Sequence, residues 1–280
     1  MIGKTLKKIR KDKNIPIQFI CDGIMDPGNY WRLENGQIES SFSTVLKLLE
    51  RMNLSIEEFA EEFPLNSNSH KIHETELVTF FKNKDLQKLK ALKERIADDL
   101  KRNKTMKLTH LYYLTDIYIA KIDENWDAQV SSEQLRKYLA KSNNWNSYEL
   151  ALLNNILFIY ELDVSYLFYK TAVSKYSQIN KEKMIPLTLN MMALAIQHND
   201  KEKLIYILSI LETIELDEKS SYERLTQKWG IQIANYYLSK NSTYLLKAEK
   251  IVDIFLQIDM KDTHHLYQSW TATYKKIIEQ

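Results

Sequence analysis

The chain has 280 residues, of which 44% are hydrophobic and 27% charged, and its formal net charge is +2. This balance excludes a protein that coats nucleic acid over its whole surface, so any such binding depends on a local basic patch. One cysteine excludes an intrachain disulfide framework, and the absence of an apolar leader or of about 18 consecutive apolar residues predicts a cytoplasmic protein without a membrane span.

The first predicted helix, residues 3–13, is amphipathic and basic. Ile2, Leu6 and Ile9 have the spacing of one helix face, which we expect to be buried. Residues 1–13 also contain six basic side chains and one acidic side chain. The basic face is either solvated or directed at phosphate groups, and the residues alone favour the solvated alternative.

A second short helix is predicted over residues 16–23, and a third over residues 27–36. Asp26 is expected to cap the third helix and Gly36 to end it. Two short helices joined by a tight turn with glycine are typical of a helix-turn-helix motif. Cys21, near the expected helix crossing, is interpreted as a small buried hydrophobic residue.

The third helix carries the candidate DNA contacts, because the second helix of a helix-turn-helix enters the major groove. Tyr30 and Leu33 are expected to point inward, which leaves four residues outside: Gly28, Asn29, Trp31 and Arg32. Asparagine suits adenine, arginine suits guanine or phosphate, and glycine permits close backbone approach. The tryptophan can contact sugar-phosphate, the first helix or a partner subunit, and the sequence leaves these alternatives open.

Helices predicted over residues 41–53 and 55–63 complete a domain that we assign to residues 1–64. Five helices in this length match the size of a phage-repressor-type DNA-binding domain. Ser40 or Ser41 is the expected cap of the first of these two helices. The side chains expected to be buried are Phe42, Val45, Leu46, Leu49, Met52, Ile56, Phe59 and Phe63.

The segment "LKKIRKDKNIPIQFICDGIMDPGNYWRLENGQIESSFSTVLKLLERMNLSIEEF" resembles the N-terminal domain of Rgg/GadR/MutR-type transcriptional regulators, within the Rgg/PlcR/PrgX-type peptide-responsive group. The helix lengths, the R-x-E-x-G pattern at residues 32–36 and the exit "LLERMNLSIEEF" carry the resemblance. It implies a homodimer on a pseudo-palindromic double-stranded DNA operator. We expect Arg10 and Gln18 at the DNA backbone, with Asn29 and Arg32 in the groove. Phe42 stands where some members have a bridging cysteine, so no such bridge is expected.

A polar linker is predicted over residues 65–70, and a helical-repeat domain for ligand sensing and dimerisation over residues 71–280. Strand signals are absent, and no clean repeat of 34 residues occurs, so the domain is a solenoid that is tetratricopeptide-like in architecture only. The predicted helices span residues 71–83, 85–103, 106–123, 131–142, 147–160, 163–178, 183–198, 200–215, 220–239, 243–257 and 262–278.

Asn155, Asn190 and Asn235 interrupt apolar helix stretches. A buried amide without a partner costs about 1–3 kcal/mol, so each amide either bonds within the stack or lines a groove. The first two are one hairpin apart, which places them on equivalent helices. Amides there can pair with an extended peptide backbone. The alternative is that each amide bridges neighbouring helices, and spacing leaves both open.

The resemblance extends into this second domain. "WNSYELALLNN" is similar to a W-x-x-Y-E segment of Rgg-type regulators that leads to an asparagine on the peptide-binding face, and "LTLNMMALAIQHN" resembles a second such segment. This implies that Asn155 and Asn190 bind a peptide, with Asn235 as a weaker third candidate. Phe158 stands where some members have an arginine, which favours a short hydrophobic signalling peptide.

No phosphate-binding glycine loop, nucleophile elbow or HExxH motif occurs, so we expect no enzyme activity, no cofactor and no metal. The predicted function is a cytoplasmic transcriptional regulator controlled by a peptide in the concave groove of its helical repeat, as in quorum sensing. One alternative is an adaptor whose helical repeat binds a protein partner. Another is a transcription factor of the same fold that responds to a small molecule or to no ligand.

Overall fold

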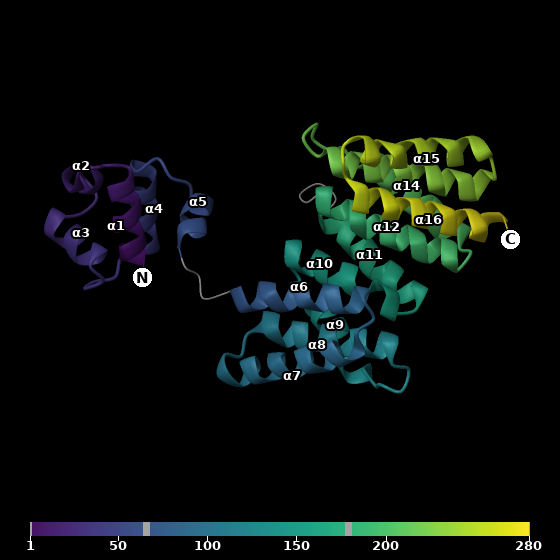
Figure 1. Cartoon of the computed structure of the whole chain (residues 1–280), viewed down its shortest axis with the longest axis horizontal. Coiled ribbons are helices and arrows are strands. Elements are labelled where there is room, and N and C mark those ends of the chain that lie inside the picture. The colour runs from purple at the N-terminus through teal and green to yellow at the C-terminus, as the bar shows by residue number, and fades with distance from the viewer. Residues whose placement is uncertain (1, 64–67, 177–180, 280) are drawn as a thin grey trace. The chain divides into compact units, whose positions relative to one another are not determined.

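The structure is a computed structural model that describes residues 2–63, 68–176 and 181–279. In these ranges the chain forms α-helices and one 3₁₀ helix, with no strand, as the all-α prediction requires. Two compact units are present, Met1–Thr75 and Glu76–Gln280 (Figure 1). Residues 64–67, where part of the predicted linker falls, lie outside the described residues, and helix α6 (Asn68–Lys82) begins within the remainder of that linker.

The first unit contains the five predicted helices, each begun or ended by a local signal. Asp26 accepts hydrogen bonds from the backbone N–H groups of Gly28 and Asn29, as predicted. Gly23 and Gly36 adopt left-handed φ values of 69° and 71°, which glycine reaches without steric cost and which reverse the chain after a helix. The helices are α1 (Ile2–Asp12), α2 (Ile17–Cys21), α3 (Pro27–Glu34), α4 (Phe42–Arg51) and α5 (Ile56–Glu62).

Two further caps fix the helices that complete this unit. Ser41 caps α4 by accepting from the N–H of Thr44, which decides between the two predicted serines. Ser55 and Glu58 form a capping box at α5, in which each side chain accepts from the other residue's backbone N–H. These local bonds determine where the helices begin. Tertiary packing determines which face of each helix is buried.

The core of the first unit differs from the prediction at four positions. Ile2, Phe42, Leu46 and Ile56 were expected to be buried and are exposed. Val45, Leu49 and Met52 are buried as predicted, and Leu48 of α4, which was not among the residues expected inside, is buried with them. Cys21 is buried and free, which confirms its interpretation as a small hydrophobic residue.

Helix α1 lies against α3 with almost no space between the two backbones. A β-carbon built on Gly3 would lie 1.7 Å from the carbonyl oxygen of Leu33, so only glycine fits at this crossing. Leu6 and Ile9 are buried on the same face of α1. Helix α1 therefore supports α3 from behind and leaves the opposite face of α3 free.

All eleven helices expected in the second domain are present among the described residues, and one of them divides. The predicted helix 147–160 becomes α10 (Ser147–Ile156) followed by the 3₁₀ helix η1 (Leu157–Ile159). Besides α6, the others are α7 (Leu86–Arg102), α8 (Met106–Ile122), α9 (Gln129–Lys141), α11 (Leu162–Tyr176), α12 (Lys181–Gln197), α13 (Lys201–Thr213), α14 (Ser221–Ser239), α15 (Ser242–Gln257) and α16 (Lys261–Glu279).

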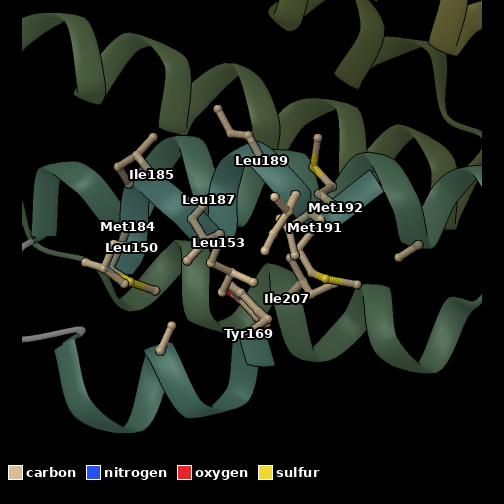
Figure 2. Close-up of a cluster of buried hydrophobic side chains, with 14 of the residues drawn as sticks. Leu150, Leu153, Tyr169, Met184, Ile185, Leu187, Leu189, Met191, Met192 and Ile207 are labelled. Carbon is tan, nitrogen blue, oxygen red and sulfur yellow. The ribbon is translucent and has the colours of Figure 1, made fainter. Parts of the chain in front are cut away.

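Successive helices of the second unit pack as hairpins, and the hairpins follow one another in chain order (Figure 1). Helix α12 contacts α10 and α14, and α14 contacts α16, so α10, α12, α14 and α16 form one row, called the even-numbered row below. Figure 2 shows side chains of α12 packed with Leu150 and Leu153 of α10 and with Tyr169 and Ile207 of the neighbouring helices. This packing confirms the predicted helical-repeat architecture and gives it one continuous core.

A buried carboxylate joins three segments at the start of the second unit. Asp116 on α8 forms an ion pair with Lys93 of α7. Its two oxygens also accept from the indole N–H of Trp126 at 2.7 Å and from the hydroxyl of Ser131 at 2.6 Å. Because Asp116 is only 7% exposed, each of these bonds forms in a low-dielectric environment that strengthens it.

Candidate functional site

Helix α3 presents the four side-chain positions that the sequence assigns to its outer face. Gly28, Asn29, Trp31 and Arg32 are exposed, whereas Tyr30, Leu33 and Glu34 are buried. Within the described residues, the guanidinium of Arg32 forms no ion pair and the side chain of Asn29 forms no hydrogen bond. Trp31 is 51% exposed and is not part of the buried core of its unit. The outer face of α3 therefore offers free polar donors beside one large aromatic ring.

Arg10 has a structural role, which argues against the predicted contact with the DNA backbone. Its Nε donates to Glu34 Oε1 at 2.5 Å and its Nη2 donates to Glu34 Oε2 at 3.0 Å. A third bond runs from Nη1 to the carbonyl oxygen of Ile15 at 3.2 Å. The two side chains are only 14% and 1% exposed, and the carboxylate raises the pKa of the guanidinium by hydrogen bonding. Arg10 thus joins α1 to α3, and Glu34 of the R-x-E-x-G pattern is its partner.

Lys7 and Lys8 of α1, and Lys13 directly after this helix, also have partners within the unit. Lys7 donates to Asn35 Oδ1 at 2.7 Å, Lys8 pairs with Glu62 at 2.6 Å, and Lys13 donates to the carbonyl oxygen of Met52 at 3.1 Å. These contacts favour the solvated alternative for the basic face over a continuous phosphate-contacting face. Gln18 of α2 is exposed and remains a candidate backbone contact.

In the second unit, an amide pair joins two neighbouring helices of the row. Asn190 Nδ2 on α12 donates to Asn154 Oδ1 on α10 at 2.9 Å. Asn190 is exposed and Asn154 is half-buried, so the pair lies at the surface of the row. The structure therefore pairs Asn190 with Asn154, whereas the sequence had matched it with the neighbouring Asn155. A shift of one residue turns a helical side chain by roughly 100°, so Asn155 points in a different direction from Asn154, and its predicted role in peptide binding stays a prediction.

The amide pair leaves hydrogen-bonding groups free for a ligand. Asn154 keeps its Nδ2 donor and Asn190 keeps its Oδ1 acceptor, and no other described group bonds to either of them. One donor beside one acceptor is the complement of a peptide unit in an extended backbone. The bond between the two amides also bridges α10 and α12, as expected from the alternative in which each asparagine joins neighbouring helices.

The remaining candidates, Asn155, Asn235 and Phe158, lie apart from this amide pair in their contacts. Asn155 is exposed on α10. Asn235 is half-buried on α14 and donates to the carbonyl oxygen of Ile231 in its own helix at 2.9 Å. Phe158 lies in η1, where its ring centroid is 5.9 Å from that of Tyr118 and 5.3 Å from Lys121 Nζ. The structure therefore places one candidate on each of α10, α12, α14 and η1.

Two further observations concern metal binding and membrane spanning. Among the described residues, no cluster of three or more His, Cys, Asp and Glu side chains has the arrangement of a metal site. None of the described helices combines the length and the apolar character that crossing a bilayer requires. The candidate sites are thus the outer face of α3 and the surface of the even-numbered row.

Comparison with known proteins gives a family match over most of the chain. The model of the family described as HTH-type transcriptional regulator Rgg, C-terminal domain, matches residues 89–269. The structure of the SHP pheromone receptor Rgg2 of Streptococcus dysgalactiae is similar over 98% of this chain and 99% of that chain, with a TM-score of 0.78 and 20% identity. The PrgX/cCF10 complex is similar over 98% and 99%, with a TM-score of 0.75 and 20% identity. No curated protein sequence matches the chain.

Proposed function

Because this chain belongs to the Rgg family of HTH-type transcriptional regulators, we propose that it is a cytoplasmic, homodimeric DNA-binding regulator controlled by a short hydrophobic signalling peptide. Such a protein works in quorum sensing, where the peptide reports cell density. Among the similar structures, Rgg2 is described as a pheromone receptor, and another is described as a bacterial peptide pheromone/receptor complex. These descriptions support the ligand class.

The proposal that the protein binds DNA is supported by the exposed outer face of α3. Asp26 caps this helix, Tyr30 and Leu33 anchor it, and the side chains of Asn29 and Arg32 point outward without a polar partner among the described residues. In the proposed complex Asn29 reads adenine and Arg32 reads guanine or holds a phosphate. The backbone at Gly28 approaches the groove closely, and Gln18 contacts the sugar-phosphate backbone. A homodimer presents two such helices to the half-sites of a pseudo-palindromic operator.

Replacing Arg32 by alanine should weaken operator binding by about 1–3 kcal/mol, because one charge-assisted contact is removed. Fluorescence anisotropy with DNA from upstream of the protein's own gene measures this change. Arg136→Ala is the matched control, since Arg136 pairs with Glu133 on the surface of the other unit. Equal affinity of Arg32→Ala and the wild type would remove Arg32 from the interface.

The free donor of Asn154 and the free acceptor of Asn190 form the proposed anchor for the peptide backbone. A peptide lying extended across α10 and α12 can bond to both amides through its backbone, whatever its side chains. Asn235 on α14 and Phe158 on η1 are proposed as further peptide contacts. Asn155 stays in the proposal as the neighbouring alternative to Asn154.

Asn190→Ala should abolish the peptide response, because it removes an anchoring acceptor and also releases Asn154. Asn154→Ala should weaken peptide binding more than Asn155→Ala does, which makes these two variants a matched pair. Titration with the labelled signalling peptide, once purified from culture medium, measures affinity, and operator binding without peptide should stay intact. If Asn155→Ala weakens peptide binding more than Asn154→Ala does, Asn155 is the peptide contact on α10, as the spacing of the asparagines predicts. If Asn190→Ala loses operator binding together with peptide binding, Asn190 has a structural role.

A further inference from the structure

A pocket of 280 Å³ opens where α8 ends, α9 begins and η1 passes between them. Its apolar wall includes Ile117 and Ala120 of α8 and Phe158 and Ile159 of η1. This volume is slightly below the range of about 300–1,000 Å³ that small-molecule sites occupy. The pocket is therefore large enough for one residue of a peptide but too small for a whole peptide.

Three polar side chains complete the lining, and none of them is acidic. They are Lys121 of α8 and Gln129 and Ser132 of α9. Lys121 is exposed, and its ammonium lies 5.3 Å from the centroid of the Phe158 ring. Among the described residues no carboxylate pairs with Lys121, and the side chains of Gln129 and Ser132 form no hydrogen bond. The apolar pocket thus has one unpaired cation and two neutral donors at its edge.

This combination of groups selects a definite ligand chemistry. An apolar wall favours an apolar side chain, while an ammonium beside an amide and a hydroxyl favours a carboxylate. In a peptide of apolar residues, an apolar side chain and a carboxylate are attached to the same α-carbon only in the last residue. A neutral peptide unit within the chain would leave Lys121 without a counter-ion.

We propose that this pocket binds the C-terminal residue of the signalling peptide, with its side chain against Phe158 and Ile159 and its carboxylate at Lys121. The inference rests on the proposed function, because it takes the ligand to be a peptide. Phe158 follows Asn154 by four residues on the continuous segment formed by α10 and η1. The peptide's last residue therefore lies beyond the amide pair, and the preceding backbone runs toward Asn154 and Asn190.

The pocket can be tested without knowledge of the peptide by using N-acetyl-leucine and N-acetyl-leucinamide as probes. These molecules differ only in the carboxylate. In methyl NMR spectra of the full-length protein, the acid should shift the methyl signals of Ile117 and Ile159, and the amide should need a roughly fivefold higher concentration. Lys121→Gln should abolish this difference between the probes. Lys250→Gln, which changes an exposed lysine of α15 outside the pocket, should preserve it.

Equal shifts from the acid and the amide, or shifts confined to other methyl groups, would overturn the assignment. A second experiment separates this failure from failure of the proposed function. The peptide purified from culture medium is compared with the same peptide synthesised as a C-terminal amide. If the wild type responds equally to both forms, the pocket proposal fails and the regulator stands. If the wild type binds no peptide from the medium, the proposed function fails, and with it the assignment of a peptide terminus.

Discussion

Replacing Glu34 by alanine should lower the free energy of unfolding of the first unit by about 3–5 kcal/mol. Glu34 is 1% exposed, and both of its carboxylate oxygens accept from Arg10. Removing it leaves a guanidinium nearly buried without a counter-charge, which costs more than the loss of the hydrogen bonds alone. A domain of about 60 residues has little stability to lose, so the variant should unfold this unit and lose operator binding.

Hydrogen exchange at the backbone amides of residues 2–63 measures this loss of stability in the full-length protein. Glu62→Ala is the matched control, because Glu62 pairs with Lys8 at an exposed site and should have little effect. A double variant, Arg10→Leu with Glu34→Leu, should be more stable than Glu34→Ala, since it leaves no unpaired charge. If Glu34→Ala exchanges no faster than the control, the ion pair does not hold α1 to α3.

The second large effect is expected in the other unit, where Asp116→Ala should cost about 3–5 kcal/mol. The change leaves the ammonium of Lys93, the indole of Trp126 and the hydroxyl of Ser131 without their common acceptor. Burial alone would raise the pKa of Asp116, but the hydrogen bonds from these three donors outweigh it and hold the pKa below the ordinary value of 3.8. The carboxylate therefore stabilises the fold above pH 3.8, and this contribution is lost as the pH falls through the lowered pKa.

Urea denaturation followed by circular dichroism tests both parts of this prediction. At neutral pH, Asp116→Ala should unfold at a clearly lower urea concentration than Asp98→Ala, which changes an exposed aspartate that pairs with Lys101. Below pH 4 the difference between wild type and Asp116→Ala should shrink, because the wild-type carboxylate becomes protonated. A difference that stays constant down to pH 2.5 would show that the carboxylate's charge contributes nothing.

The helix boundaries follow from the sequence because their signals are local. Asp26 caps α3 by accepting hydrogen bonds from N–H groups two and three residues further along the chain, and Gly36 ends the helix. Neither signal depends on the rest of the fold. The outer face of α3 was also predictable. Two buried residues, Tyr30 and Leu33, fix its orientation, and the remaining positions follow from the helical period.

The errors arise where a side chain's partner is distant in the sequence. No sequence pattern connects Arg10 with Glu34, which is 24 residues away, so the ion pair that argues against a DNA contact of Arg10 could not be predicted. Phe42 and Leu46 fit an apolar stripe of α4, but the packed face is the one that carries Leu48. No sequence pattern marks Lys121 as a site residue, because only the fold brings α8, α9 and η1 to one pocket.

The proposed regulator binds both an operator and a peptide, and the peptide controls transcription from the operator. The most direct test is fluorescence anisotropy of the purified protein on DNA from upstream of its own gene, with and without the small-peptide fraction of culture medium. We predict specific binding that weakens steeply as salt increases and that shifts when the fraction is added. Asn190→Ala should bind the same DNA and show no shift. Absence of specific DNA binding, or a shift that Asn190→Ala shares with the wild type, would contradict this account.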